Sequence, residues 1–261
     1  MTDESQHKRP VRGAYLLPNA LTTGALLAGF FAIVAAIQGE PVAACIAVVI
    51  AGVLDGLDGR VARMMGTHSD FGVQYDSLSD MVSFGLAPAV LVWTWSLDTL
   101  AMPGLVGEKI GWLAAFFYSA CAALRLARFN TQAGVADKRY FQGLASPAAA
   151  GTLVATIWFF ESRGIGPEVV AWPMLVLTIA LGTLMVSRVR YVSFKGGETR
   201  QRVPIAWIFA LLVIVVLLAI DLPAVLFTIG ILYVSSGLFL TARGRYQQRR
   251  RRRREAHDGD S

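Results

Sequence analysis

Apolar residues along the chain gather into long runs separated by short polar segments, and most of these runs contain close to 20 residues. A run of that length lets an α-helix cross the hydrocarbon core of a bilayer. The pattern predicts eight membrane spans, at 16–37, 41–63, 72–96, 110–129, 147–161, 168–187, 203–220 and 222–242. The predicted fold class is therefore all-α, a polytopic integral membrane helical bundle with one transmembrane domain over residues 16–242.

The composition agrees with a membrane protein. Hydrophobic residues make up 55% of the 261 residues and charged residues 16%, whereas soluble domains carry about 25% charged residues. The two cysteines, Cys45 and Cys121, both lie inside apolar runs, and they share no metal-binding or redox spacing. We therefore expect both thiols to pack in the core.

Lysine and arginine collect at alternate ends of the predicted spans. They are frequent in segment 1–15, after the second, fourth and sixth spans, and in the tail 243–261, which contains six consecutive arginines, Arg249–Arg254. Because cytoplasmic loops retain these residues, we expect both termini and the 64–71 loop to face the cytoplasm, most simply of a bacterial inner membrane. The arginine run is expected to bind anionic lipid head groups. A nucleic-acid partner is not expected, because this short tail lacks a folded reading module.

Four aspartates flank the 64–71 loop: Asp55 and Asp58 near the end of one predicted span, and Asp76 and Asp80 near the start of the next. Helical spacing places the two aspartates of each pair on one face of their helix. The two faces can therefore meet across a helical hairpin. Four carboxylates in a site of low dielectric need cations, and the nearby Arg63 supplies a single charge. Oxygen ligands favour Mg²⁺ or Mn²⁺, and two such ions suit phosphoryl transfer.

Other readings of the same aspartates stay open at this point. Intramembrane acids also line ion or proton pathways in transporters. Zinc is not favoured, because His68 is the one histidine in the loop and no cysteine accompanies it.

The spacing D-x-x-D-G-x-x-A-R, eight residues, G-x-x-x-D-x-x-x-D resembles the signature of the CDP-alcohol phosphatidyltransferase family. In this chain it reads Asp55, Asp58, Gly59, Ala62, Arg63, Gly72, Asp76 and Asp80. The resemblance implies that an alcohol displaces CMP from a CDP-linked lipid at two divalent ions, and that six helices form a family core to which this chain adds two. It also implies a homodimer.

The family pattern assigns roles to these residues. The four aspartates would be metal ligands, and Asp80 would also be the general base for the incoming hydroxyl. The CDP-binding positions would be Asp58, Gly59, Ala62, Arg63 and Gly72.

Two further stretches bear on the acceptor alcohol: ALRLARFN (123–130) and FQGLASPAAAG (141–151). Arg125 and Arg128 can offer a bidentate fork to a carboxylate, although arginines at a helix end also snorkel to the membrane surface. Together with DSLSDMVSFGLAPA, these stretches resemble the family members that use L-serine, except that Ala145 stands where those members have proline. The resemblance implies serine binding by Arg125, Arg128, Asn130 and Gln142.

The expected reaction joins CDP-diacylglycerol and L-serine to give phosphatidylserine and CMP. Glycerol phosphate, inositol phosphate and choline stay open as alternative acceptors within the family. A cation transporter that uses the same aspartates is the alternative from another class.

Overall fold

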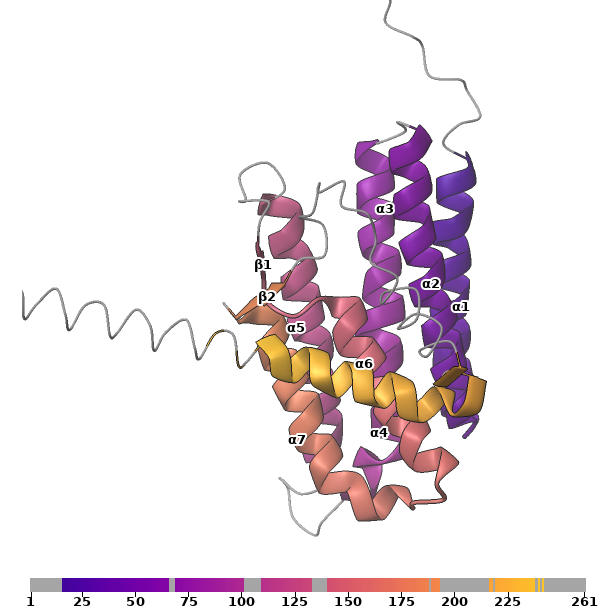
Figure 1. Cartoon of the computed structure of the whole chain (residues 1–261), viewed down its shortest axis with the longest axis vertical. Coiled ribbons are helices and arrows are strands. Elements are labelled where there is room, and N and C mark those ends of the chain that lie inside the picture. The colour runs from indigo at the N-terminus through magenta and orange to yellow at the C-terminus, as the bar shows by residue number, and fades with distance from the viewer. Residues whose placement is uncertain are drawn as a thin grey trace, which may run out of the picture.

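The computed structural model describes residues 16–65, 69–100, 109–132, 140–187, 189–192, 216–217, 219–237, 239 and 241. Helices dominate this part of the chain (Figure 1). In order they are α1 (Leu16–Ile37), α2 (Pro41–Met65), α3 (Asp70–Asp80), the π-helical turn η1 (Met81–Leu86), α4 (Ala87–Trp95), the 3₁₀ turn η2 (Leu97–Leu100), α5 (Ile110–Gln132), α6 (Ser146–Ser162) and α7 (Pro167–Val186). A further apolar helix spans Leu222–Gly237.

The predicted polytopic helical bundle is confirmed. Five helical segments are long and apolar enough to cross a membrane: Leu16–Ile37, Pro41–Met65, Asp70–Trp95, Ile110–Thr131 and Pro167–Val186. The sixth predicted span corresponds to α7, and the fifth corresponds to α6, which is shorter at 17 residues. The chain is therefore an integral membrane protein.

The predicted count of eight spans is not confirmed. Most of the seventh span, 203–220, lies outside the described residues, as do segment 1–15 and the tail 243–261. The eighth span corresponds to the helix Leu222–Gly237. Residues 239 and 241 are helical as well, and positions 238, 240 and 242 lie outside the described residues. In Figure 1 this yellow helix runs across the bundle, whereas α1 and α2 run along its long axis.

Small residues form the contact between α1 and α2. Ala32 and Ala35 of α1 and Ala44 of α2 are fully buried, while large side chains of α1 such as Leu27 and Phe30 point outward and are exposed. Small residues let transmembrane helices approach closely, and apolar side chains on the outside suit a lipid environment. Cys45 and Cys121 are both buried free thiols, as predicted.

The third span contains a π-helical turn directly after Asp80. Side-chain hydroxyls of α5 bond two carbonyl oxygens of this turn: Tyr118 donates to Phe84 at 3.1 Å, and Ser119 donates to Gly85 at 3.1 Å. Ser83 of the same turn donates to the carbonyl of Ala25 in α1 at 3.0 Å. A π turn inserts an extra residue into a helix and is often found at functional sites. Here its carbonyl groups bind α5, and its serine binds α1.

Two three-residue strands, which the all-α prediction did not include, pair in antiparallel register. They are β1 (Tyr140–Gln142) and β2 (Arg190–Val192), with Phe141 opposite Tyr191. Directly after β1, Gly143 adopts φ +85°, and a Cβ atom there would lie 2.3 Å from the carbonyl oxygen of Met185. Glycine is required by both the conformation and the close approach. The segment after β1 is thereby fixed against the end of α7.

Candidate active site

Three of the predicted aspartates converge between α2 and α3. Asp55, Asp76 and Asp80 each offer a carboxylate oxygen, and these oxygens lie within 4.8 Å of one another. Asp76 and Asp80 are four residues apart on α3, so both project from the face that meets α2. Asp55 lies roughly 15 Å from the end of α2 along the helix axis, because an α-helix rises about 1.5 Å per residue. The carboxylates are therefore grouped well inside the helical hairpin, as the spacing predicted.

One oxygen of this group has no hydrogen-bond partner within the described part of the chain. Asp76 Oδ1 is buried and accepts no hydrogen bond from any described residue. A buried polar atom without a partner costs about 1 to 3 kcal/mol, and a charged one costs more. Hard divalent cations prefer carboxylate oxygens. The carboxylate group and its unpaired oxygen therefore fit a divalent metal ion.

Asp58, the fourth predicted ligand, is not part of this group of three. It is 5% exposed, and its Oδ2 atom accepts a hydrogen bond of 2.7 Å from the hydroxyl of Thr22 in α1. The carbonyl of Thr22 in turn accepts a bond of 3.2 Å from Ser79 of α3. Thr22 therefore links α1 to both helices that carry the aspartates. The family motif does not include Thr22, and the sequence analysis missed it. The available signal was the pair of hydroxyl residues Thr22 and Thr23 within a mostly apolar predicted span.

The predicted CDP-binding positions surround the aspartates on the same two helices. A Cβ atom on Gly59 would meet no atom of the described residues within 4 Å, so these residues leave the backbone of α2 accessible there. Ala62 is partly exposed, and Arg63 is exposed in the last turn of α2. Gly72 lies in the first turn of α3, where its N–H donates to the N-cap hydroxyl of Ser69 at 3.0 Å. These surroundings leave room for a ligand beside Gly59.

The predicted acceptor residues occupy the end of α5 and strand β1. Arg125 donates from Nε to the carbonyl oxygen of Leu144, and its guanidinium lies within electrostatic range of Asp80. Asn130 donates from Nδ2 to Ser77 Oγ at 3.0 Å. The structure therefore brings Asn130 of α5 into contact with Ser77 of α3, a contact that the sequence did not specify.

The other two predicted acceptor residues lie on the same two elements, α5 and β1. Arg128 lies one turn beyond Arg125 on α5, and its carbonyl oxygen accepts a 3.0 Å bond from Thr131. Gln142 lies in β1 opposite Arg190, and its side chain lies outside the described part of the structure.

The fold and the site together define a polytopic helical membrane protein with a carboxylate centre suited to a divalent metal. The family model described as CDP-alcohol phosphatidyltransferase matches residues 15–184, a segment that runs from the start of α1 into the last turn of α7. The chain belongs to the CDP-alcohol phosphatidyltransferase family.

Curated relatives show the same family relationship. The chain is 34% identical over 195 residues to a protein of Mycobacterium leprae named CDP-diacylglycerol--serine O-phosphatidyltransferase, and the match covers 72% of this chain and 62% of that protein. A Helicobacter pylori protein of the same name is 37% identical over 186 residues, which cover 71% of this chain and 76% of that protein. An archaetidylserine synthase of Methanothermobacter thermautotrophicus is 36% identical over 182 residues, with 69% of this chain and 71% of that protein covered.

Proposed function

We propose that the protein transfers the phosphatidyl group of CDP-diacylglycerol to the hydroxyl of L-serine, producing phosphatidylserine and CMP. The observation that carries the proposal is the convergence of Asp55, Asp76 and Asp80, whose oxygens lie within 4.8 Å of one another. Family membership defines the reaction class. The names of the bacterial relatives support serine as the acceptor.

Asp80 is the general base in this proposal. The serine oxygen attacks the lipid-side phosphorus, the bond from that phosphorus to the oxygen of CMP breaks, and CMP leaves. Asp80 takes the proton of the serine hydroxyl, because it belongs to the carboxylate group and directly precedes the π turn that α1 and α5 hold in place. A positioned base of this kind contributes about 10²- to 10⁴-fold to a rate.

The same group of carboxylates would hold the metal. Asp55, Asp76 and Asp80 would be the principal ligands, because their carboxylate oxygens lie close together. Asp58, which is hydrogen-bonded to Thr22, would be the fourth ligand. Two Mg²⁺ or Mn²⁺ ions bound there would neutralise the diphosphate and stabilise charge on the departing CMP.

The two substrates would be bound by different sets of residues. Asp58, Gly59, Ala62, Arg63 and Gly72 would bind CDP, because the open space beside Gly59 lets a nucleotide approach the helix backbone. Arg125, Arg128, Asn130 and Gln142 would bind serine. A guanidinium matches the two oxygens of the serine carboxylate, which makes the arginines the principal acceptor contacts.

We further propose the membrane setting. The protein would lie in a bacterial inner membrane as a homodimer, with a transmembrane domain of about eight helices over residues 16–242. Segment 1–15, the active site and the tail 243–261 would face the cytoplasm, and the arginines of the tail would bind anionic head groups. Cysteines introduced at position 68 and in the run 249–254 should react with an impermeant maleimide from the cytoplasmic side alone. Labelling from the outer side contradicts the orientation.

An acceptor screen tests the function. Purified protein is given CDP-diacylglycerol, Mg²⁺ or Mn²⁺, and in turn L-serine, glycerol phosphate, inositol phosphate or choline, while CMP and the lipid product are measured. We expect CMP and phosphatidylserine to form in equal amounts with L-serine. Turnover with another acceptor but not with serine contradicts the assignment, and ion flux without CMP release supports the transporter alternative.

A further inference from the structure

A cavity of about 250 Å³ lies at the end of the bundle opposite the aspartates. Helices α1, α4 and α6 end beside it, and α2 and α7 begin there. Pro41, the first residue of α2, lines the cavity and lies about 20 Å along the helix axis from Asp55. The cavity is therefore separate from the carboxylate group that would hold the metal.

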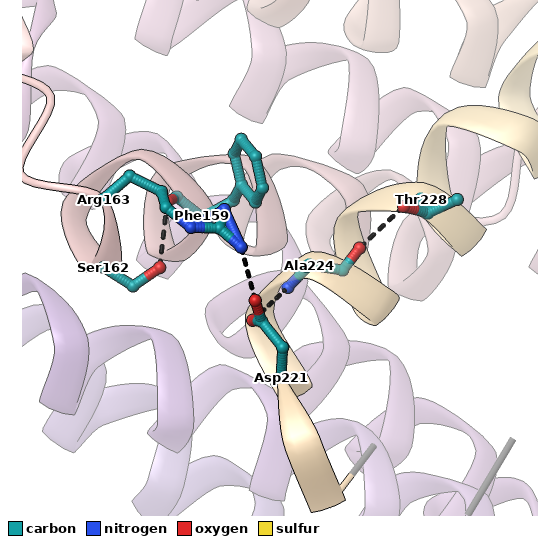
Figure 2. Close-up of polar contacts among 6 residues, drawn as sticks. All are labelled: Phe159, Ser162, Arg163, Asp221, Ala224 and Thr228. Carbon is teal, nitrogen blue, oxygen red and sulfur yellow. Dashed lines mark hydrogen bonds and ion pairs between the residues drawn. The ribbon is translucent and has the colours of Figure 1, made fainter. Parts of the chain in front are cut away.

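Glu161, near the end of α6, is the ionisable side chain of the described lining. Its Oε2 atom accepts a hydrogen bond of 2.7 Å from Nε1 of Trp95, and no described residue forms an ion pair with it. Arg163 is engaged elsewhere. Figure 2 shows its guanidinium donating to Asp221, and the guanidinium carbon lies 4.6 Å from the centre of the Phe159 ring. Within the described part of the chain, the negative charge of Glu161 is therefore not compensated.

The polar side chains that line the cavity have acceptors to offer but no spare donor. The indole N–H of Trp95 is used in its bond to Glu161. The Thr94 hydroxyl donates to two carbonyl oxygens one turn earlier in α4, at 3.0 and 3.2 Å. The lone pairs of Thr94 Oγ1 and the second carboxylate oxygen of Glu161 remain as acceptors. This lining suits a ligand that carries positive charge and donates hydrogen bonds.

The helix ends do not favour an anion in the cavity. Three helix C-termini and two helix N-termini meet there, and each C-terminus carries a partial negative charge. Both helices that begin there start with proline, Pro41 and Pro167, which has no backbone N–H to give to an anion.

The cavity is better suited to an organic cation than to a metal ion. A hard divalent ion takes about six or more oxygen ligands, whereas the described lining supplies one carboxylate. The volume of about 250 Å³ is several times the roughly 30 Å³ that one water molecule occupies in the liquid. The space therefore fits a cationic group of several atoms.

Exposed tryptophans mark the level of the cavity in the membrane. Trp93 lies in the last turn of α4, and Trp112 and Trp172 lie in the first two turns of α5 and α7. All three are exposed. Tryptophan is enriched where a membrane protein crosses the head-group region, because its ring is apolar and its N–H is polar. The cavity therefore lies at the head-group level of the membrane surface opposite the aspartates.

We propose that this cavity binds a primary ammonium group, carried by an aminophospholipid head group or by a free small amine. The three N–H groups of an ammonium match the acceptors Glu161 and Thr94, and its charge compensates the carboxylate. The head-group level of the cavity favours the lipid as the source of the ammonium.

Lipid binding to the purified full chain in detergent, followed by native mass spectrometry, tests the proposal. The probes are phosphatidylethanolamine and N-acetyl phosphatidylethanolamine, which lacks the ammonium group. Glu161→Gln keeps an oxygen for the bond from Trp95 but removes the charge. Asp98→Asn is the matched control, because Asp98 is an exposed acid at the same end of the bundle.

We expect the Kd for phosphatidylethanolamine to rise at least about tenfold in Glu161→Gln and by less than about twofold in Asp98→Asn. Wild-type protein should bind the N-acetyl lipid at least about tenfold more weakly than phosphatidylethanolamine. A second arm uses ethanolamine alone and measures the midpoint of thermal unfolding. A midpoint that ethanolamine raises in wild type but not in Glu161→Gln assigns the site to a free amine.

Two results overturn the proposal. One is equal affinity of wild type and Glu161→Gln for phosphatidylethanolamine, together with equal responses to ethanolamine. The other, which needs no variant, is equal binding of the two lipids by wild type, because the ammonium group is then not recognised. Binding is measured without turnover, so neither result depends on which acceptor the enzyme uses.

Discussion

Thr22 of α1 donates a hydrogen bond of 2.7 Å to the carboxylate of Asp58 in α2. Both residues are buried, at 5% exposure each. A carboxylate removed from water needs donors of this kind. The bond therefore fixes the orientation of an aspartate in the family motif from a helix that contributes none of the motif's residues.

Removal of the Thr22 hydroxyl should lower the affinity of the site for its metal ion. Partners that orient ligating carboxylates typically contribute about 10- to 100-fold to metal affinity. We therefore expect the Mn²⁺ concentration for half-maximal CMP release to rise about tenfold or more in Thr22→Val and much less in Thr22→Ser. Thr23→Val is the control, since the Thr23 hydroxyl is exposed and bonds Tyr75 and the carbonyl of Asn19. Equal metal requirements in Thr22→Val and Thr23→Val refute the role of Thr22.

Asp80→Asn should remove the base while keeping the size of the side chain. Turnover is expected to fall by about 100-fold or more, and additional Mn²⁺ should not restore it. Asp70→Asn is the matched control on the same helix, because Asp70 is exposed in the first turn of α3. Steady-state kinetics of CMP release measure both variants. A loss of less than about tenfold in Asp80→Asn rules out this residue as the general base.

Arg128→Ala should act on acceptor binding. Loss of a guanidinium that holds the serine carboxylate raises the KM for L-serine far more than the KM for CDP-diacylglycerol. Arg128→Lys should rescue binding only in part, because an ammonium group lacks the bidentate geometry. If both KM values rise equally, Arg128 positions α5 or the diphosphate, and serine is bound by Arg125 and Asn130.

Gly29→Ala should destabilise the bundle beside the site. A Cβ atom at this position would lie 2.4 Å from Ser83 Oγ and 2.7 Å from Ser83 Cα, so α1 would move away from the π turn. We expect a loss of about 1 to 3 kcal/mol, seen as a lower midpoint of thermal unfolding in detergent. Gly151→Ala is the control, since its Cβ atom would meet no atom of the described part of the chain within 4 Å. A midpoint for Gly29→Ala equal to that of Gly151→Ala contradicts this close contact.

The sequence predicted the features that depend on local patterns. The apolar run at 16–37 matches the bounds of α1, because the polar turn before Pro41 interrupts it. The spacing of Asp76 and Asp80 predicted that they share a face, and Asp55 indeed faces them.

Contacts between segments far apart in the chain could not be predicted in the same way. Spacing alone does not indicate that Thr22 reaches Asp58 or that Ser77 bonds Asn130, because both bonds depend on how helices pack. The pairing of β1 with β2 was missed for the same reason, since three-residue strands carry no periodic signal. Apolar length alone predicted a span at 222–242 and did not indicate that Leu222–Gly237 packs across α6.

The central claim is that the aspartate group carries out a metal-dependent transfer to serine. The most direct measurement is phosphatidylserine formation from CDP-diacylglycerol and L-serine by wild type and Asp76→Asn, with EDTA and after Mn²⁺ is restored. Asp76 is chosen because its Oδ1 atom is buried and has no hydrogen-bond partner among the residues that the structure describes. We predict that wild type is inactive in EDTA and recovers with Mn²⁺, and that Asp76→Asn stays folded but loses at least about 100-fold in rate. Full activity of wild type in EDTA, or of Asp76→Asn with Mn²⁺, would contradict the claim.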